Sequence, residues 1–381
     1  MALNIRLIAA EFGHLRPLHL LLTLTSAATP NRHPMTEIPQ PPPSFAVSHF
    51  DVSHFDVSHG EGPLPPGLKG AVIAIGNFDG VHRGHRAVIA AATERARTLG
   101  RPAAALTFEP HPRSFFRPQE PLFRLTDART KLRLFAATGL AGAIVLRFDA
   151  QLAEPAPESF VDDILIQRLG ISGAVVGFDF RFGRDRTGTP DLLAEQGARR
   201  NFTVDVVPAV EVEGRRVSSG LVRETLAAGH IEEANALLGY PWFVSGEIVH
   251  GDKRGRELGY PTANMRLDPA CGLRHGIYAV RVGVGERRYD GVASFGRRPM
   301  FDVGTVLLEV FLFDFSGDLY GRVIDVAFLN WIRAELSFPS VEELVRRMDE
   351  DSRRARAALA RMPEAFPPLG DVPAACDPAA D

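Results

Sequence analysis

Two histidines in a glycine-punctuated stretch have the spacing that points most directly to chemistry. His82 and His85 stand in GNFDGVHRGH, residues 76–85, which also contains Gly76, Gly80 and Gly84. Three residues apart, the two imidazoles would share one face of a helical turn. The free N–H groups at a helix start attract anions, most often phosphate. The stretch therefore predicts a site where imidazoles bridge the oxygens of a triphosphate; the alternative is two surface histidines at an ordinary strand–helix corner.

The elements that must position these histidines follow from the periodicity around them. The apolar run 71–75 is typical of a strand buried on both faces, and a helix pattern follows it. Strand and helix patterns then alternate as far as residue 228, which predicts a parallel sheet with ligands outside the carboxyl ends of its strands. The expected strands are 71–75, 103–108, 142–146, 173–177 and 203–207, and the expected helices are 85–99, 127–138 and 157–169.

Three further segments place polar and aromatic residues at the ends of expected strands. TFEPHP (107–112) is a proline-stiffened strand exit where His111 has either a substrate role or a structural one. GFDFRFGRDRTG (177–188) would offer partners to a flat ring and to a phosphate, unless it is a solvated basic loop. VSSGLVRE (217–224) begins as a serine-capped helix, with Arg223 one turn in.

The character of the chain changes after a break at 237–241. Alternating segments at 242–249, 276–284, 288–295, 306–313 and 323–331 predict a small closed barrel, and 341–361 is one amphipathic helix. HGDKRGRELGYPTAN (250–264) is a glycine-rich basic loop that would cover phosphates, or else a surface hairpin. Thr262 and Asn264, two apart, would offer oxygen ligands of the kind that Mg²⁺ prefers.

Glu309 is a lone acid in the strand-like run LLEVFLFDF. If it faces a pocket it is a candidate general base, and burial would raise its pKa. If it lies on the polar face of its strand it is a solvated surface residue.

Composition bounds the class of protein. With 381 residues, two domains are expected, and a net charge of −3 gives no overall field to attract nucleic acid or a membrane surface. The two cysteines, Cys271 and Cys376, form no disulfide framework, which fits a reducing cytoplasm.

The first 68 residues do not look like part of the fold. Residues 18–28 resemble the apolar core of a signal peptide, 39–43 are proline-rich, and SHFDV occurs twice in tandem from residue 48. We expect 1–68 to be a disordered, low-complexity and dispensable extension, with Met35 a candidate true start. An export signal is the less favoured alternative.

Taken in order, GNFDGVHRGH, TFEPHP, GFDFRFGRDRTG, GYPTAN, LEVFLFDF and WIRAE closely resemble the bacterial bifunctional riboflavin kinase/FAD synthetase family. The resemblance implies an α/β fold in which a Rossmann-like nucleotidyltransferase domain (69–236) precedes a six-stranded antiparallel flavokinase barrel with a C-terminal helix (237–362). A disordered tail (363–381) would follow. The implied reactions are riboflavin plus ATP to FMN, and FMN plus ATP to FAD and pyrophosphate, both with Mg²⁺.

The resemblance also implies roles for individual residues. His82, His85 and Arg223 would be catalytic in adenylylation and Glu309 would be the kinase base. The other ATP contacts of the adenylylation site would be Gly76, Asn77, Phe78, Gly80, Gly84, Arg184, Ser218 and Ser219. Those of the kinase would be Gly251, Gly255, Arg256, Gly259, Pro261, Thr262 and Asn264, with Thr262 and Asn264 holding the metal. Flavin would contact His111, Asp179, Phe182, Arg333 and Glu335.

The sequence departs from the family pattern at Gly220, Ser294, Phe295, Met300 and Phe311, and these departures put turnover and substrate affinity in question more than identity. Two other functions stay open: another nucleotidyltransferase with an accessory barrel, and a flavin-binding carrier without chemistry. We expect small-molecule partners only, in a monomer or weak homo-oligomer.

Overall fold

A computed structural model describes residues 55–60, 62–251, 258–297 and 306–372. All of them belong to one compact unit, Ser48–Asp381. Gly255 and Arg256 of the expected kinase loop, and the departure at Met300, lie outside the described residues.

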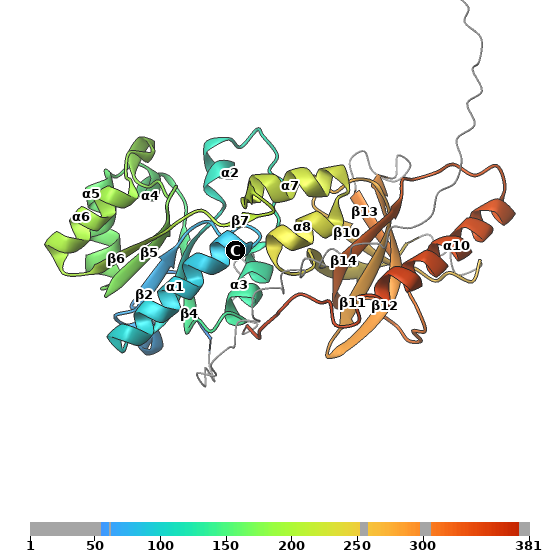
Figure 1. Ribbon diagram of the computed structural model, residues 1–381, viewed down its shortest axis with the longest axis horizontal. Helices are drawn as coiled ribbons and strands as arrows, with labels where there is room; N and C mark the ends of the chain where they lie inside the picture. Colours follow the sequence, from blue (N-terminus) through green and yellow to red (C-terminus); the bar gives the residue numbers. More distant parts are fainter. Residues whose placement is uncertain (1–54, 61, 252–257, 298–305, 373–381) are drawn as a thin grey trace, which may run out of the picture. The chain divides into compact units, whose positions relative to one another are not determined.

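A six-stranded parallel sheet forms the first half of this unit, with the strand order β1-β4-β3-β2-β5-β6 (Figure 1). All five expected strands are present. Successive residues of β2 alternate between two apolar clusters, Val72 and Ala74 in one and Ile73 and Ile75 in the other, so the sheet is buried on both faces. The strands are β1 Asp56–Ser58, β2 Val72–Ile75, β3 Ala103–Glu109, β4 Gly142–Arg147, β5 Gly173–Gly177 and β6 Thr203–Val207.

The edge strand β1 corrects the expected boundary at residue 69. Asp56–Ser58 pairs in parallel with Gly142–Ile144 of β4, and Phe55 is buried. Gly142 is required there, because a side chain would collide with the Asp56 carbonyl oxygen. Leu64 and Leu68 are buried in the same domain, so residues 55–60 and 62–68 are part of it, although residues 55–59 belong to a repeat that resembles low-complexity sequence.

Helices connect the strands of the sheet, and their starts follow local capping rules. Asp127 caps α3 by accepting from Thr130 N at 2.6 Å, where the sequence predicts a helix start. The expected helix at 157–169 is mostly π-helical, and α6 was not expected. The α-helices are α1 Arg83–Leu99, α2 Pro112–Phe116, α3 Ala128–Ala136, α4 Ala150–Ala153, α5 Pro157–Ser159, α6 Pro190–Arg200, α7 Ser219–Ala228 and α8 Ile231–Leu238. The π-helix is η2 Phe160–Arg168, and the 3₁₀ turns are η1 Pro66–Leu68 and η3 Arg184–Arg186. A short hairpin is formed by β7 Glu211–Val212 and β8 Arg215–Arg216.

The second half is a closed antiparallel barrel in the order β10-β13-β12-β11-β14-β9, followed by the helix α10 (Val341–Leu359). The five strands expected from periodicity are present. The sixth, β10, begins at the end of the predicted glycine-rich loop 250–264, and it completes the six strands that the family resemblance implies. The strands are β9 Phe243–Val249, β10 Ala263–Leu267, β11 Gly276–Val284, β12 Arg287–Arg297, β13 Val306–Leu312 and β14 Val323–Arg333.

The segment after α10 corrects the expectation of a disordered tail from residue 363. Buried Arg281 of β11 donates to the carbonyl oxygens of Met362 at 2.6 Å and Pro363 at 2.8 Å. Further along, Gly370 N donates to Arg133 O at 2.9 Å. Residues 363–372 are therefore held against the fold by specific hydrogen bonds.

The predicted break at 237–241 is anchored to the sheet domain. The Tyr240 hydroxyl donates to Gly80 O at 2.6 Å, and the Trp242 indole donates to Leu125 O at 3.0 Å.

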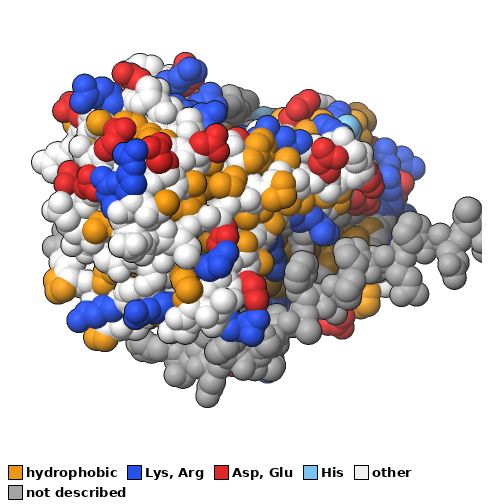
Figure 2. All heavy atoms as spheres, turned by 60° about the vertical axis from the view of Figure 1, so that its left-hand side comes forward, with side chains coloured by type: hydrophobic (Ala, Val, Ile, Leu, Met, Phe, Trp, Pro, Cys, Tyr) orange, Lys and Arg blue, Asp and Glu red, His pale blue; other side chains and the backbone are white. Residues whose placement is uncertain are grey.

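Basic and acidic side chains are interspersed on the face that Figure 2 shows.

Candidate functional site

One cavity of about 1350 Å³ opens at the carboxyl ends of the sheet strands. It is bordered by the residues that follow β2, β3, β5 and β6, where a parallel sheet receives its ligands. Of the residues assigned to adenylylation from the sequence, Gly80 alone does not line it. Those that do are Gly76, Asn77, Phe78, His82, Gly84, His85, His111, Asp179, Phe182, Arg184, Ser218, Ser219 and Arg223.

His82 is the N-cap of α1. Its Nδ1 accepts a hydrogen bond from His85 N at 3.2 Å. The side chain is buried, and this burial lowers its pKa to about 4, so the ring is neutral at pH 7. A neutral imidazole that accepts at Nδ1 carries its proton on Nε2. His82 is therefore fixed as an uncharged Nε2–H donor at the wall of the cavity.

His85 stacks on His82, with the two ring centroids 3.5 Å apart and the planes 14° from parallel. Burial holds the pKa of His85 well below its usual value, and the nearby His82 and Lys131 lower it further. Its Nδ1 is buried without a hydrogen-bond partner among the described residues. The edge of Phe78, 5.3 Å away between centroids, fixes the ring from another side.

The loop between β2 and α1 is strained. Phe78 and Val81 have φ values of 50° and 36°, which side-chain-bearing residues rarely adopt. Gly80, at φ 83°, lies behind the cavity: a Cβ there would come within 2.8 Å of the Leu125 side chain. Gly80 thus shapes the loop without lining the cavity.

Asp79 organises the back of the site, although the sequence assigned it no role. Its Oδ1 accepts from the amides of Leu125 at 2.9 Å and Thr126 at 3.1 Å. Its Oδ2 is ion-paired with Arg223, which also donates from Nε to the Phe123 carbonyl. The Arg223 guanidinium is therefore held in one orientation at the cavity wall.

The two serines at the start of α7 also make protein contacts. Ser218 Oγ accepts from Leu221 N at 3.2 Å as the N-cap, and Ser219 Oγ donates to Asp79 O at 2.8 Å. Gly220 has open space beside it, since a Cβ would meet only Ser218 Oγ, at 3.7 Å. The missing hydroxyl at residue 220 thus leaves room at the site.

The residues expected to meet flavin in this cavity differ in how firmly they are held. His111 caps α2 by accepting from Arg113 N at 3.1 Å, and burial lowers its pKa to about 4. Phe182 is buried and stacks on Phe180 at 5.4 Å. Asp179 is exposed and ion-paired with Arg216. Arg184, which was assigned to ATP rather than flavin, is also exposed and donates from Nε to Glu154 O at 2.7 Å.

In the barrel, the strand register brings the expected kinase residues together. Asn264 of β10 is the direct partner of Glu309 of β13, and Ser294 of β12 is its partner on the other side. Directly opposed residues place their side chains on the same face, roughly 5 Å apart at Cβ. Asn264 is buried and donates to Thr262 O at 3.5 Å, and Gly251 lies against its amide. Gly259 and Pro261 flank this corner in the chain.

The pair expected on the flavin side of the kinase is partly committed to protein contacts. Arg333 donates from Nη2 to Asp351 Oδ2 at 2.6 Å and from Nη1 to Ala334 O at 2.8 Å. Exposed Glu335 comes within 3.9 Å of His275.

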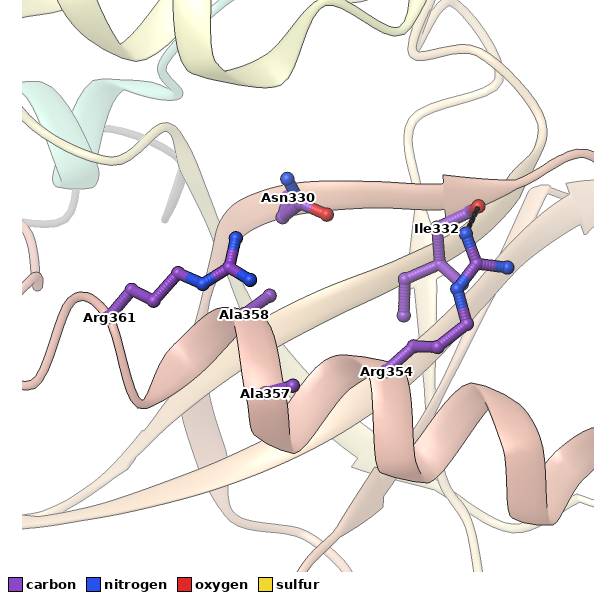
Figure 3. Close-up of a pocket in the computed structure, with 6 residues that line it drawn as sticks. All are labelled: Asn330, Ile332, Arg354, Ala357, Ala358 and Arg361. Carbon is purple, nitrogen blue, oxygen red and sulfur yellow. Dashed lines mark hydrogen bonds between the residues drawn. The ribbon is translucent and has the colours of Figure 1, made fainter.

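A separate pocket of about 250 Å³ lies between α10 and β14, and no residue assigned from the sequence lines it (Figure 3). Arg354 closes one end of it by donating to Ile332 O at 3.2 Å.

The described residues contain neither a metal-holding group of acidic, His or Cys side chains nor a membrane-spanning helix. In this part of the chain, no three His, Cys, Asp or Glu side chains group in a way that could hold a metal ion. Nor does any of its helices have the length and apolar character needed to cross a bilayer.

Comparisons with known proteins cover both halves of the chain. The profile described as FAD synthetase matches residues 65–221, and that described as riboflavin kinase matches residues 238–359. The bifunctional riboflavin kinase/FMN adenylyltransferase of Pseudomonas fluorescens is 42% identical over 78% of this chain and 96% of its own length. Its Escherichia coli K12 namesake is 40% identical over 76% and 92%.

A solved structure agrees in architecture. The crystal structure titled macrolide-efflux protein, from Streptococcus pneumoniae, aligns with a TM-score of 0.71 and 31% identity over 78% of this chain and 97% of that one. The cavity at the strand ends, the paired Asn264 and Glu309 of the barrel and these matches lead to one conclusion. The chain belongs to the family of bifunctional riboflavin kinase/FMN adenylyltransferases.

Proposed function

We propose that the chain makes flavin cofactors in two steps. The barrel phosphorylates riboflavin with ATP to give FMN and ADP, and the cavity of the sheet domain adenylylates FMN to give FAD and pyrophosphate. The observation that carries the proposal is the convergence of thirteen assigned residues on one cavity. The family matches over both halves of the chain support the same pair of activities.

The adenylylation site suits a reaction that needs donors rather than a base. The nucleophile is the FMN phosphate, an anion at neutral pH, so no proton has to be removed from it. His82 and His85, both neutral, stand at the start of α1 where an anion is favoured. Asp79, a buried carboxylate at the cavity wall, is occupied by Arg223 and two amides. Catalysis then rests on positioning and on hydrogen bonds that strengthen as charge builds around the α-phosphorus.

The remaining cavity residues would divide between the two substrates. Ser218, Ser219 and Arg223 line the cavity and would contact the nucleotide, as would the exposed Arg184. Half-buried His111 would offer a neutral donor to flavin and buried Phe182 an aromatic face, and Asp179 lines the same cavity.

The kinase reaction has the opposite requirement. Its nucleophile is an alcohol, which becomes reactive when a positioned base accepts its proton. Glu309 would be that base, and its register partner Asn264 would contact the nucleotide on the same face of the barrel. Ser294 is the register partner of Glu309 on its other side. This departure from the family pattern therefore adjoins the proposed base directly.

Mg²⁺ is the cofactor that this corner of the barrel fits. Thr262 and Asn264 contribute a hydroxyl and an amide oxygen, which are hard and neutral ligands. With no acidic cluster among the described residues, the other ligands would be phosphate oxygens and water. When bound, the ion would offset negative charge on the transferring phosphate. Arg333 and Glu335 would border the flavin. We also place the protein in the cytoplasm as a monomer or weak homo-oligomer, without nucleic-acid or membrane partners.

The test is chromatography of the flavins formed when the purified protein is incubated with riboflavin, ATP and MgCl₂. FMN should rise first and FAD should follow, with ADP and pyrophosphate released in the two steps. Chelation of the metal should stop both. Consumption of ATP with another acceptor, or flavin binding without any product, would contradict the proposal.

A further inference from the structure

A lysine is buried beneath the adenylylation cavity. Lys131 belongs to α3, and its side chain is only 1% exposed. Its ammonium donates to Glu109 Oε1 at 2.8 Å and to Thr107 Oγ1 at 3.3 Å. Lysine is seldom fully buried, because removing its charge from water is unfavourable unless a partner compensates.

The compensation here is incomplete. Arg124 donates to the same oxygen of Glu109 at 2.7 Å, so one carboxylate serves two cations. Arg124 Nε is also buried without a hydrogen-bond partner among the described residues. The neighbouring pair of Asp79 and Arg223 is balanced within itself. These five groups therefore leave one net positive charge.

This excess charge adjoins the predicted triphosphate position. Thr107, which Lys131 contacts, donates to Asn77 O at 3.2 Å, and Asn77 lines the cavity. Glu109 is two residues before His111, another lining residue. Lys131 also acts on two histidines that line the cavity, because its positive charge lowers the pKa of both His85 and His111.

We propose that Lys131 and Arg124, sharing the single carboxylate of Glu109, supply a buried positive charge that attracts the triphosphate of ATP and the pyrophosphate product. This inference rests on the proposed adenylylation function. Lys131 would act at a distance, through its electric field, while His82 and His85 make the direct contacts.

The alternative is that Lys131 and Glu109 only hold β3 and α3 together. The two explanations predict opposite effects of Glu109→Gln on the affinity for pyrophosphate. If charge is what matters, Lys131→Met should weaken the binding of inorganic pyrophosphate about tenfold. Glu109→Gln should bind it at least as tightly as the unmodified chain. The double variant Glu109→Gln/Lys131→Met, which restores the original net charge, should bind close to the unmodified chain. If the pair is structural, both single variants should lose affinity.

The measurement is calorimetric titration of the full-length protein with inorganic pyrophosphate, with FAD and FMN formation measured on the same samples. Arg97→Met is the matched control, since it removes one cation from an exposed pair on α1. Equal affinity of Lys131→Met and the unmodified chain would overturn the inference, as would parallel losses in Lys131→Met and Glu109→Gln. An unmodified chain that neither binds pyrophosphate nor makes FAD would instead overturn the proposed adenylylation itself, and the inference with it.

Discussion

Replacing His82 should separate a structural task from a chemical one. The ring caps α1 through Nδ1 and offers Nε2–H to the cavity. In His82→Ala both are lost. Loss of an N-cap costs about 1 kcal/mol, which lowers the melting temperature by roughly 2–4 °C in a domain of this size. Loss of one preorganised donor should slow FAD formation roughly 10²–10³-fold.

His82→Ser is the informative partner of that variant. Serine is among the best N-caps, so its hydroxyl should accept from His85 N and restore the melting temperature. It is too short to reach where Nε2 stands, so FAD formation should stay slow. FMN formation from riboflavin should be nearly unchanged in both variants.

The assay is therefore a melting curve together with chromatography of both flavin products for each variant. Recovery of FAD formation in His82→Ser would refute the reasoning, because capping would then be the whole contribution of His82. Equal loss of FMN and FAD formation would mean that the ring holds the fold together.

Three other outcomes are expected. His85→Ala should also slow FAD formation roughly 10²–10³-fold, and combining it with His82→Ala should cost less than the sum of the two, because both rings serve one phosphate cluster; additive losses would contradict a shared role. A chain that starts at Pro63 lacks β1 and buried Phe55, so its free energy of unfolding should fall by about 2 kcal/mol relative to a chain that starts at Ser48; equal melting temperatures would show that β1 is dispensable. Because the fold lowers the pKa of His82 from 6.5 to about 4, the unfolded chain binds more protons than the folded chain at acid pH. The stability that neutral His82 contributes is therefore full above pH 6.5, and the free energy of unfolding should fall by up to about 3 kcal/mol as the pH falls toward 4. His82→Ser should reduce that fall in melting curves, and an unchanged pH dependence would contradict this prediction.

Periodicity along the sequence was enough to find the sheet and most of the barrel. The strands that were expected are apolar or alternating runs whose partners follow at regular distances, so local pattern and tertiary position agree. The edge strand β1 has no such pattern. It is a strand only because β4 offers a free edge and Gly142 lets the Asp56 backbone approach.

Residues that face the cavity were easier to predict than residues that support it. His82, Ser218 and Arg223 carry local signals, since each stands at or near a helix start that follows a strand. Asp79 stood inside a recognised motif, yet its partners lie 46 and 144 residues away. Lys131 had no signal at all, because a lysine in an amphipathic helix is normally expected at the surface. Buried charges of this kind are visible only when the strands and helices that enclose them are in place.

The central claim is that two separate sites perform two reactions with different chemical needs. Glu309→Gln tests it most directly, because it removes the one group proposed as a base and leaves the sheet-domain cavity untouched. Supplied with riboflavin, ATP and MgCl₂, the folded variant should form almost no FMN and therefore no FAD. Supplied with FMN instead of riboflavin, it should form FAD at the rate of the unmodified chain. Equal loss of FAD formation from FMN would contradict the division of labour between the two sites.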